Sequence, residues 1–167
     1  MRVLLLSDTH GALDARIAAL AADCALAAHA GDVGAASVLD ALAERCPRVI
    51  AVRGNNDVAA KWLGPAAALH GLDAEARIEL PGGVLAVVHG DALAARDRHA
   101  RLRRVYAGAR AVLYGHSHRL CVDDAIAPWV LNAGAAGRAR THGGPSCLLL
   151  HAGVRTWRVE AVRFPPA

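Results

Sequence analysis

The sequence predicts an α/β protein in which helices cover β-sheets. Strand-like and helix-like segments alternate near the start of the chain, and strand-like segments dominate later. The chain has 167 residues, of which 54% are hydrophobic and 20% charged, as expected for one compact domain with its own core. The sequence contains no internal repeat, low-complexity tract or linker, so residues 1–167 are predicted to form a single domain.

The first part of the chain has a β-α-β pattern. A short apolar run opens the chain, Leu13, Ile17 and Leu20 then recur at helical spacing, and a second apolar run follows. The expected elements are strands over residues 2–7, 24–30 and 48–53 and helices over residues 12–22 and 37–44.

The later part of the chain is richer in strands. The Pro81-Gly82-Gly83 turn separates two strand candidates, which predicts a hairpin, and Ala152-Gly153 marks the turn of a terminal hairpin. The expected elements are a long basic helix over residues 92–106 and strands over residues 76–80, 84–88, 111–114, 126–131, 146–151 and 154–163.

Composition limits the classes of partner. The net charge is +4, and the 19 Lys and Arg include a cluster of arginines between residues 96 and 104, which favours anionic partners. A charge cluster on one helix is usually a solvated face, and only 4% of the residues are aromatic. Nucleic acid is therefore a less favoured partner than a small anionic molecule.

Neither export nor membrane insertion is predicted. The apolar stretch before Asp8 is too short for the ~7–15-residue hydrophobic region of a secretory signal, and no uncharged run approaches the ~18 apolar residues of a spanning helix. The four cysteines lack a C-x-x-C pair, so neither a zinc ribbon nor a disulfide framework is indicated. We therefore expect a cytoplasmic protein with reduced thiols.

Polar motifs follow several of the predicted strands. In open α/β sheets, ligands gather beyond the carboxyl ends of strands, so these motifs are expected to meet at one sheet edge. Any one of them alone is weak evidence, because an Asp-x-His or Gly-Asp pair is more often a turn. The motifs are Ser7-Asp8-Thr9-His10-Gly11, Gly31-Asp32, Gly54-Asn55-Asn56-Asp57, His89-Gly90 and Gly115-His116-Ser117-His118.

The residue types in these motifs predict bound transition-metal ions. Residues two apart on an extended segment point the same way, so Asp8 with His10, and His116 with His118, are expected to act as pairs. Four imidazoles, two carboxylates and one amide oxygen suit Mn, Fe, Zn, Co or Ni better than Ca or Mg. Two divalent ions would bring +4 against the −2 of Asp8 and Asp32, which leaves a positive centre suited to a phosphoryl group.

Taken in this order, the motifs resemble those of the calcineurin-like metallophosphoesterases, particularly their small bacterial and archaeal branch. The resemblance runs from the N-terminus to about residue 163. It implies a four-layer α/β/β/α sandwich with two divalent transition-metal ions per chain at one sheet edge, manganese being expected first. The ligand sets it implies are Asp8, His10 and His118 for one metal and Asn55, His89 and His116 for the other, with Asp32 bridging both.

The sequence departs from the family pattern at two positions. Larger relatives place a histidine, thought to protonate the leaving group, where this chain has Asn56. Because an amide cannot act as a general acid, poor leaving groups are expected to react slowly, and diesters are the expected substrates. Relatives also commonly carry a second histidine where this chain has Asp91.

The predicted function is metal-dependent hydrolysis of phosphate esters, with a phosphodiesterase expected first. Metal-bound hydroxide held near Asp32 would attack phosphorus in a small phosphate ester, and Asp32, Asn55 and His89 are the predicted catalytic residues. The alternatives are a phosphomonoesterase, a nuclease, or a non-catalytic protein-binding scaffold, since the same fold serves as a protein-binding subunit of the eukaryotic retromer complex. A homo-oligomer is compatible with the sequence.

Some polar residues near the motifs have two interpretations. His29 either orients a ligand or is a hydrogen-bonded core residue. Asp57 either supports Asn55 or caps a following helix. The Asn132-Ala133-Gly134 segment resembles an Asn-Pro-Gly loop that borders the site in relatives, and a plain turn explains it equally well.

Overall fold

The computed structural model describes residues 1–166. Within these residues the strands form two five-stranded sheets, ordered β10-β9-β1-β2-β3 and β4-β5-β6-β8-β7. The first sheet contains β1 (Arg2–Leu6), β2 (Leu26–His29), β3 (Val49–Ala51), β9 (Ser146–Ala152) and β10 (Trp157–Arg163). The second sheet contains β4 (Glu75–Leu80), β5 (Gly83–Val88), β6 (Ala111–Tyr114), β7 (Cys121–Asp123) and β8 (Trp129–Asn132).

Both sheets are mixed. In the first sheet β1, β2 and β3 run parallel, and β9 and β10 add an antiparallel hairpin beside β1. In the second sheet β5, β6 and β8 run parallel, and the edge strands β4 and β7 are antiparallel to their neighbours. The parallel strands therefore present their carboxyl ends together, as the β-α-β pattern of the sequence predicts.

The main hydrophobic core lies between the two sheets. Successive side chains of β1 alternate between its faces, so Val3 and Leu5 enter this core while Leu4 and Leu6 face the opposite side. Leu85 of β5 and Leu113 of β6 enter the same core from the second sheet. Because both faces of β1 are buried, its sequence is a continuous apolar run.

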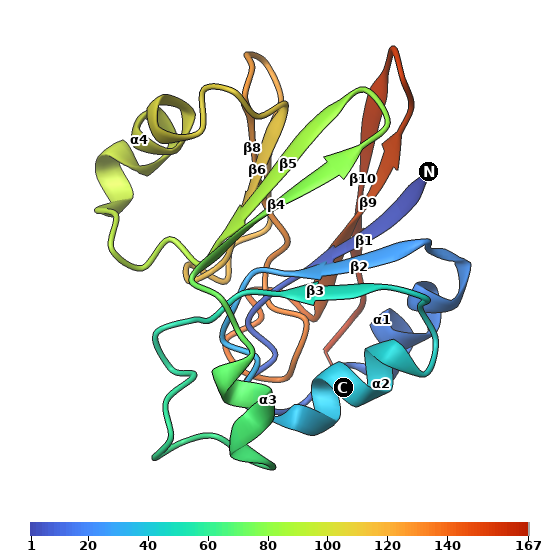
Figure 1. Ribbon diagram of the computed structural model, residues 1–167, viewed down its shortest axis with the longest axis vertical. Helices are drawn as coiled ribbons and strands as arrows, with labels where there is room; N and C mark the ends of the chain where they lie inside the picture. Colours follow the sequence, from blue (N-terminus) through green and yellow to red (C-terminus); the bar gives the residue numbers. More distant parts are fainter. Residues whose placement is uncertain (167) are drawn as a thin grey trace.

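Helices cover the outer faces of both sheets. α1 (Ala15–Leu20) and α2 (Ala36–Ala43) pack on the first sheet through residues such as Ile17 and Leu42. α4 (Arg98–Val105) packs on the second sheet through Leu102. Figure 1 shows α4 on one side of the molecule and α1 and α2 on the other. The predicted four-layer α/β/β/α sandwich is confirmed.

Several predicted boundaries differ from the structure. The helix expected over 12–22 begins only at Ala15, where the Asp14 carboxylate accepts a hydrogen bond from Arg16 N at 2.9 Å, as an N-cap does. The helix expected over 92–106 begins at Arg98, whose guanidinium donates to the Leu93 carbonyl, and only the 3₁₀ turn η2 (Ala95–Asp97) precedes it.

Two short elements were not predicted. α3 (Ala66–His70) follows Pro65 and packs through Leu69 in a small cluster beside the loop after β2. β7 has only three residues, too few for an alternating pattern to be recognised. In addition, the strand expected from residue 126 starts at Trp129, after Pro128, which has no amide proton to donate to a sheet.

None of the helices within residues 1–166 is long and apolar enough to cross a membrane.

Candidate metal centre

The predicted ligand residues gather at one edge of the two sheets. Each follows a parallel strand: Asp8 and His10 follow β1, Asp32 follows β2, Asn55 follows β3, His89 follows β5, and His116 and His118 follow β6. The hydrogen bonds from Asp8 N to Gly31 O at 3.0 Å and from Gly115 N to His89 O at 3.1 Å join neighbouring loops within each sheet. The side chains therefore lie together at the carboxyl ends of the strands, where the sequence places them.

The backbone at these positions is not extended, so the extended conformation predicted from the sequence is wrong. Asp8, His10, His116 and His118 have φ angles of 54°, 47°, 66° and 56°, in the left-handed region, and Asp32 has a φ of 54°. Non-glycine residues rarely adopt this conformation, and they concentrate at functional sites when they do. The side chains therefore converge because the backbone reverses direction sharply after each strand, not because alternate residues of a strand share a face.

Glycine at position 115 leaves room for the buried ligand atoms. A Cβ added to Gly115 would lie 2.9 Å from Asp8 Oδ2 and 3.1 Å from His89 Nδ1. A Cβ at Gly54 would collide with the backbone nitrogen and carboxylate of Asp32. The glycines of these motifs thus allow backbone and carboxylates to approach more closely than any side chain would permit.

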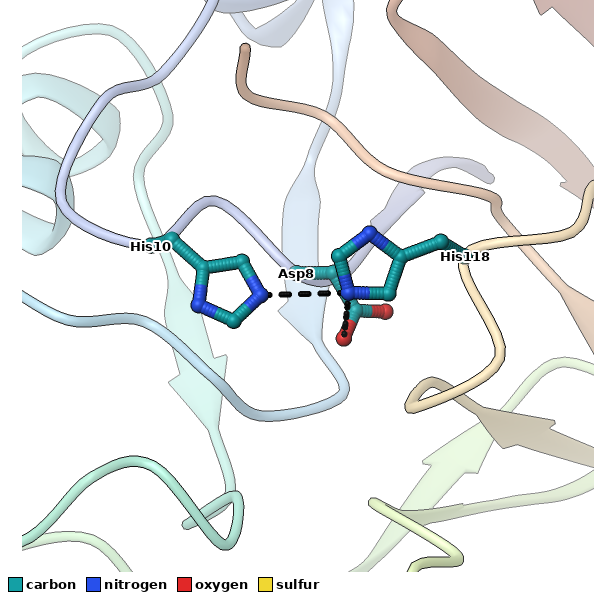
Figure 2. A group of neighbouring side chains, drawn as sticks. All are labelled: Asp8, His10 and His118. Atoms are coloured by element: carbon teal, nitrogen blue, oxygen red, sulfur yellow. Dashed lines mark hydrogen bonds and ion pairs between the residues drawn. The ribbon is translucent and has the colours of Figure 1, made fainter. Parts of the chain in front are cut away.

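Asp8, His10 and His118 form one group that could hold a metal ion. His10 Nε2 lies 3.1 Å from His118 Nε2, and His118 Nε2 lies 3.3 Å from Asp8 Oδ1. Figure 2 shows the two rings turned toward each other with the Asp8 carboxylate beside His118. Asp8 and His118 are buried, while His10 is partly exposed.

A second group is centred on Asp32 and His89. His89 Nε2 lies 3.4 Å from Asp32 Oδ2 and 3.1 Å from Asn55 Oδ1, and Asn55 Oδ1 is also 3.1 Å from His116 Nδ1. Asp8 approaches Asp32 and His89 closely enough to belong to this group as well. Asp32 Oδ2 lies 3.7 Å from His10 Nε2 and so faces the first group. Both carboxylates therefore stand between the two groups.

The arrangement of lone pairs fits bound cations. His89 Nδ1 donates to Ala30 O at 2.8 Å, so a neutral His89 directs the lone pair of Nε2 toward the oxygens of Asp32 and Asn55. Asp8 Oδ2 is buried and has no hydrogen-bond partner among residues 1–166. Electron-rich atoms that face one another, one of them a buried carboxylate oxygen without a donor, are suited to a divalent ion.

The pKa shifts agree with this chemistry for most of the imidazoles. Burial lowers the pKa of His118 to about 4, with a smaller contribution from Arg140. Burial also lowers the pKa values of His10 and His116. These rings are therefore neutral near pH 7, the form that binds metals. Burial raises the pKa of Asp8 to about 7, so its carboxylate needs a nearby cation to ionise fully.

Asp32 and His89 behave as an ion pair in the absence of such a cation. Burial alone would raise the pKa of Asp32, but the hydrogen bond and charge of His89 and the hydrogen bonds from Asn56 outweigh it and hold the pKa below its usual value. For His89, burial is likewise outweighed by Asp32, so the pKa is raised. A metal ion between them would replace the shared proton.

Asn56 holds Asp32 in place, a role that was not predicted from the sequence. Its backbone N donates to Asp32 Oδ1 and its side-chain Nδ2 donates to Asp32 Oδ2, both at 2.8 Å. Lys61 Nζ in turn donates to Asn56 Oδ1 at 2.6 Å. Asn56, which stands where larger relatives have a histidine, therefore donates a hydrogen bond to each carboxylate oxygen of a predicted metal ligand.

Asp57 joins the loop that carries Asp32 to the loop that carries Asn55. Its buried carboxylate accepts hydrogen bonds from the backbone nitrogens of Val33 at 3.1 Å and of Gly34 and Gly54 at 2.8 Å. Of its two interpretations, support of the Asn55 loop is the one that the structure shows. No signal in the sequence identifies the three amides.

His29 is a hydrogen-bonded core residue. Its Nε2 lies 2.9 Å from Thr9 Oγ1, and the Thr9 hydroxyl donates to Val33 O at 2.9 Å. Burial lowers the pKa of His29 to about 3, so the ring is neutral. His29 thereby supports the backbone between Asp8 and His10 without reaching the site itself.

The end of β8 and the loop that follows it support the His116–His118 segment. Asn132 donates through Nδ2 to Gly115 O at 2.9 Å, so the Asn132-Ala133-Gly134 segment does border the site. Farther along, Ala139 O accepts from His118 Nδ1 at 3.1 Å, and Arg140 Nη2 lies 3.0 Å from His118 Nε2. Arg140 was not among the predicted site residues, because no motif or spacing distinguishes it from the other arginines.

The fold is similar to those of several solved structures. Vps29 from Entamoeba histolytica, solved as a zinc complex, is 18% identical to this chain with a TM-score of 0.75. The match covers 98% of this chain and 99% of the Vps29 chain. An archaeal phosphodiesterase is 20% identical with a TM-score of 0.72, covering 97% of this chain and 100% of its own. A predicted phosphoesterase from Streptococcus pneumoniae is 18% identical with a TM-score of 0.68, covering 97% and 88%. No curated protein matches the chain.

Two helix-flanked mixed sheets with this polar edge define a sandwich of the metallophosphoesterase class. The family model described as the calcineurin-like phosphoesterase superfamily domain matches residues 1–154. The chain belongs to this superfamily, as its motifs predicted.

Proposed function

We propose that this chain is a metal-dependent phosphodiesterase with a dinuclear centre of transition-metal ions, Mn being the first candidate. The observation that carries the proposal is the position of the two carboxylates between opposing groups of histidines. Asp32 Oδ2 lies 3.7 Å from His10 Nε2 and 3.4 Å from His89 Nε2, so one carboxylate can serve ions on both sides. We assign Asp8, His10 and His118 to one ion, Asn55, His89 and His116 to the other, and Asp32 to both.

Two divalent ions, when bound, supply positive charge for the phosphoryl oxygens and lower the pKa of a water that attacks phosphorus. The protein supplies the geometry. Two hydrogen bonds from Asn56 keep Asp32 in its position between the two groups. His89 is fixed by its bond to Ala30 O, and Asn55 contributes a neutral oxygen that leaves the centre positive. A positive centre favours a phosphate ester over a neutral substrate.

The proposed preference for diesters rests on the resemblance to the small bacterial and archaeal branch and on Asn56. Its side-chain NH₂ is engaged with Asp32, and an amide does not release a proton at neutral pH, so it cannot protonate an expelled alkoxide. Substrates whose leaving groups are stable as anions should therefore react best. The substrate we propose is a small phosphodiester.

The test is a substrate panel on metal-free protein reconstituted with Mn, Fe, Zn, Co or Ni. Turnover of bis(p-nitrophenyl) phosphate is compared with that of p-nitrophenyl phosphate, cyclic nucleotides and single-stranded DNA, and metal-free protein is the control. Faster turnover of the diester in a metal-dependent reaction is expected. A tenfold preference for the monoester would overturn the diester assignment, and no turnover with two ions bound would favour a protein-binding scaffold.

A further inference from the structure

Arg140 is placed at the candidate metal centre by the loop that follows β8. The loop approaches His118 from both sides of its ring, since Ala139 O accepts from Nδ1 at 3.1 Å and Arg140 Nη2 lies 3.0 Å from Nε2. Arg140 has a φ of 51°, a left-handed conformation that is uncommon outside glycine. At this bend the long cationic side chain reaches the site at His118 while remaining exposed to solvent.

The contact between Arg140 and His118 is suited to change when the site is filled. Because His118 Nδ1 donates to Ala139 O, its Nε2 carries the lone pair, and Arg140 donates to it. That lone pair faces His10 Nε2 at 3.1 Å and Asp8 Oδ1 at 3.3 Å, the atoms proposed to hold one ion. One lone pair serves either an ion or a guanidinium, so an ion there leaves the guanidinium free beside it.

We propose that Arg140 is a substrate-binding residue that contacts the non-bridging oxygens of the phosphoryl group. This inference rests on the proposed function and deepens it. A guanidinium has paired N–H donors whose spacing matches two phosphate oxygens, and it stays charged at every physiological pH. Arg140 is exposed, so its side chain can turn from His118 to an arriving anion without unfolding the loop. The class of ligand recognised is a tetrahedral oxyanion carrying at least one negative charge.

The chain offers a matched control for charge on the same loop. Arg138 is also exposed, and it lines a separate hollow with residues that include Leu13 and Pro145. Arg138→Gln removes one positive charge, as Arg140→Gln does, from a residue two positions earlier in the sequence. Arg140→Lys keeps the charge but removes the planar fork of donors.

The experiment measures binding of inorganic phosphate to Mn-reconstituted protein by calorimetry, together with metal content, KM and kcat. Arg140→Gln is expected to weaken phosphate binding and raise KM about 10- to 100-fold, as loss of a hydrogen bond to a charged group does, with metal content unchanged. Arg140→Lys should fall between wild type and Arg140→Gln, and Arg138→Gln should bind phosphate within about twofold of wild type.

Several results would overturn the inference. If Arg140→Gln and Arg138→Gln weaken phosphate binding equally, Arg140 acts only through its contribution to the general surface charge. Tighter metal binding with unchanged phosphate affinity in Arg140→Gln would make Arg140 a competitor of the ion. Absence of phosphate binding by the wild type would also refute it. If the wild type binds phosphate in an Arg140-dependent manner yet hydrolyses no ester, the inference stands and the proposed hydrolase function fails.

Discussion

The buried carboxyl of Asp8 should make the metal-free protein less stable as pH rises. Burial raises its pKa in the folded protein from the usual 3.8 to about 7, so between these values the folded state binds a proton that the unfolded state has lost. The shifted pKa of Asp8 does not change the free energy of unfolding below about pH 4, and it lowers that free energy by its full amount above about pH 7. The difference corresponds to about 4 kcal/mol at 1.36 kcal/mol per pKa unit.

The assay is urea unfolding of metal-free wild type and Asp8→Asn between pH 4 and pH 8. The other titrating groups of the site act in both proteins, so the pH dependence of the difference in unfolding free energy reports Asp8 together with its charge interactions with His89 and Asp32. We expect the variant to gain on the wild type by up to about 4 kcal/mol as pH rises through this window. Adding Mn²⁺ should remove the loss in the wild type, because an adjacent cation stabilises the ionised carboxylate. A difference that stays constant from pH 4 to pH 8 would refute the reasoning.

Three further predictions concern the loops around the site. Asp32→Asn should reduce both metal content and turnover by about 10- to 100-fold more than Asn55→Asp, because an amide at position 32 loses the charge proposed to serve both ions. Equal metal content and turnover in the two variants would contradict this prediction. Gly115→Ala should weaken Mn²⁺ binding measured by calorimetry at least tenfold, since its Cβ would lie 2.9 Å from a buried carboxylate oxygen, whereas Gly108→Ala, with nothing within 4 Å, should bind normally. Asn56→His should raise turnover of an alkyl diester relative to a nitrophenyl diester, because it restores a proton donor; an unchanged ratio would count against the missing-acid argument.

The convergence of the candidate ligand residues could be predicted from sequence because each motif follows an apolar strand. Val3 to Leu6 form such a run before Asp8, and Ala111 to Tyr114 form another before His116. Once those runs are assigned to parallel strands, topology alone brings the following polar residues to one edge. Side-chain direction could not be predicted in the same way. It depends on left-handed backbone at Asp8, His10 and the other reversals, which residue types other than glycine do not signal.

Residues that support the site from the backbone were the least predictable. Asp57 acts on three amides of two loops, and those amides exist in every sequence, so no side-chain pattern reports them. Asn56 was interpreted only as the loss of a family histidine, although it gains two hydrogen bonds to Asp32. Arg140 lies 22 positions from its partner His118, on a loop whose path no local propensity determines.

The distribution of the proposed ligands along the chain would make ion binding a late event in folding. His10 and His118 are 108 positions apart and follow strands of different sheets, so their nitrogens meet only after both sheets have docked. An unfolded or half-folded chain offers scattered ligands with little joint affinity. Bound ions would then stabilise only the completed domain, by about 2.7 kcal/mol when the free ion is at 100 times its dissociation constant. Supply of the ion would thereby shift the folding equilibrium of the whole domain toward the folded state.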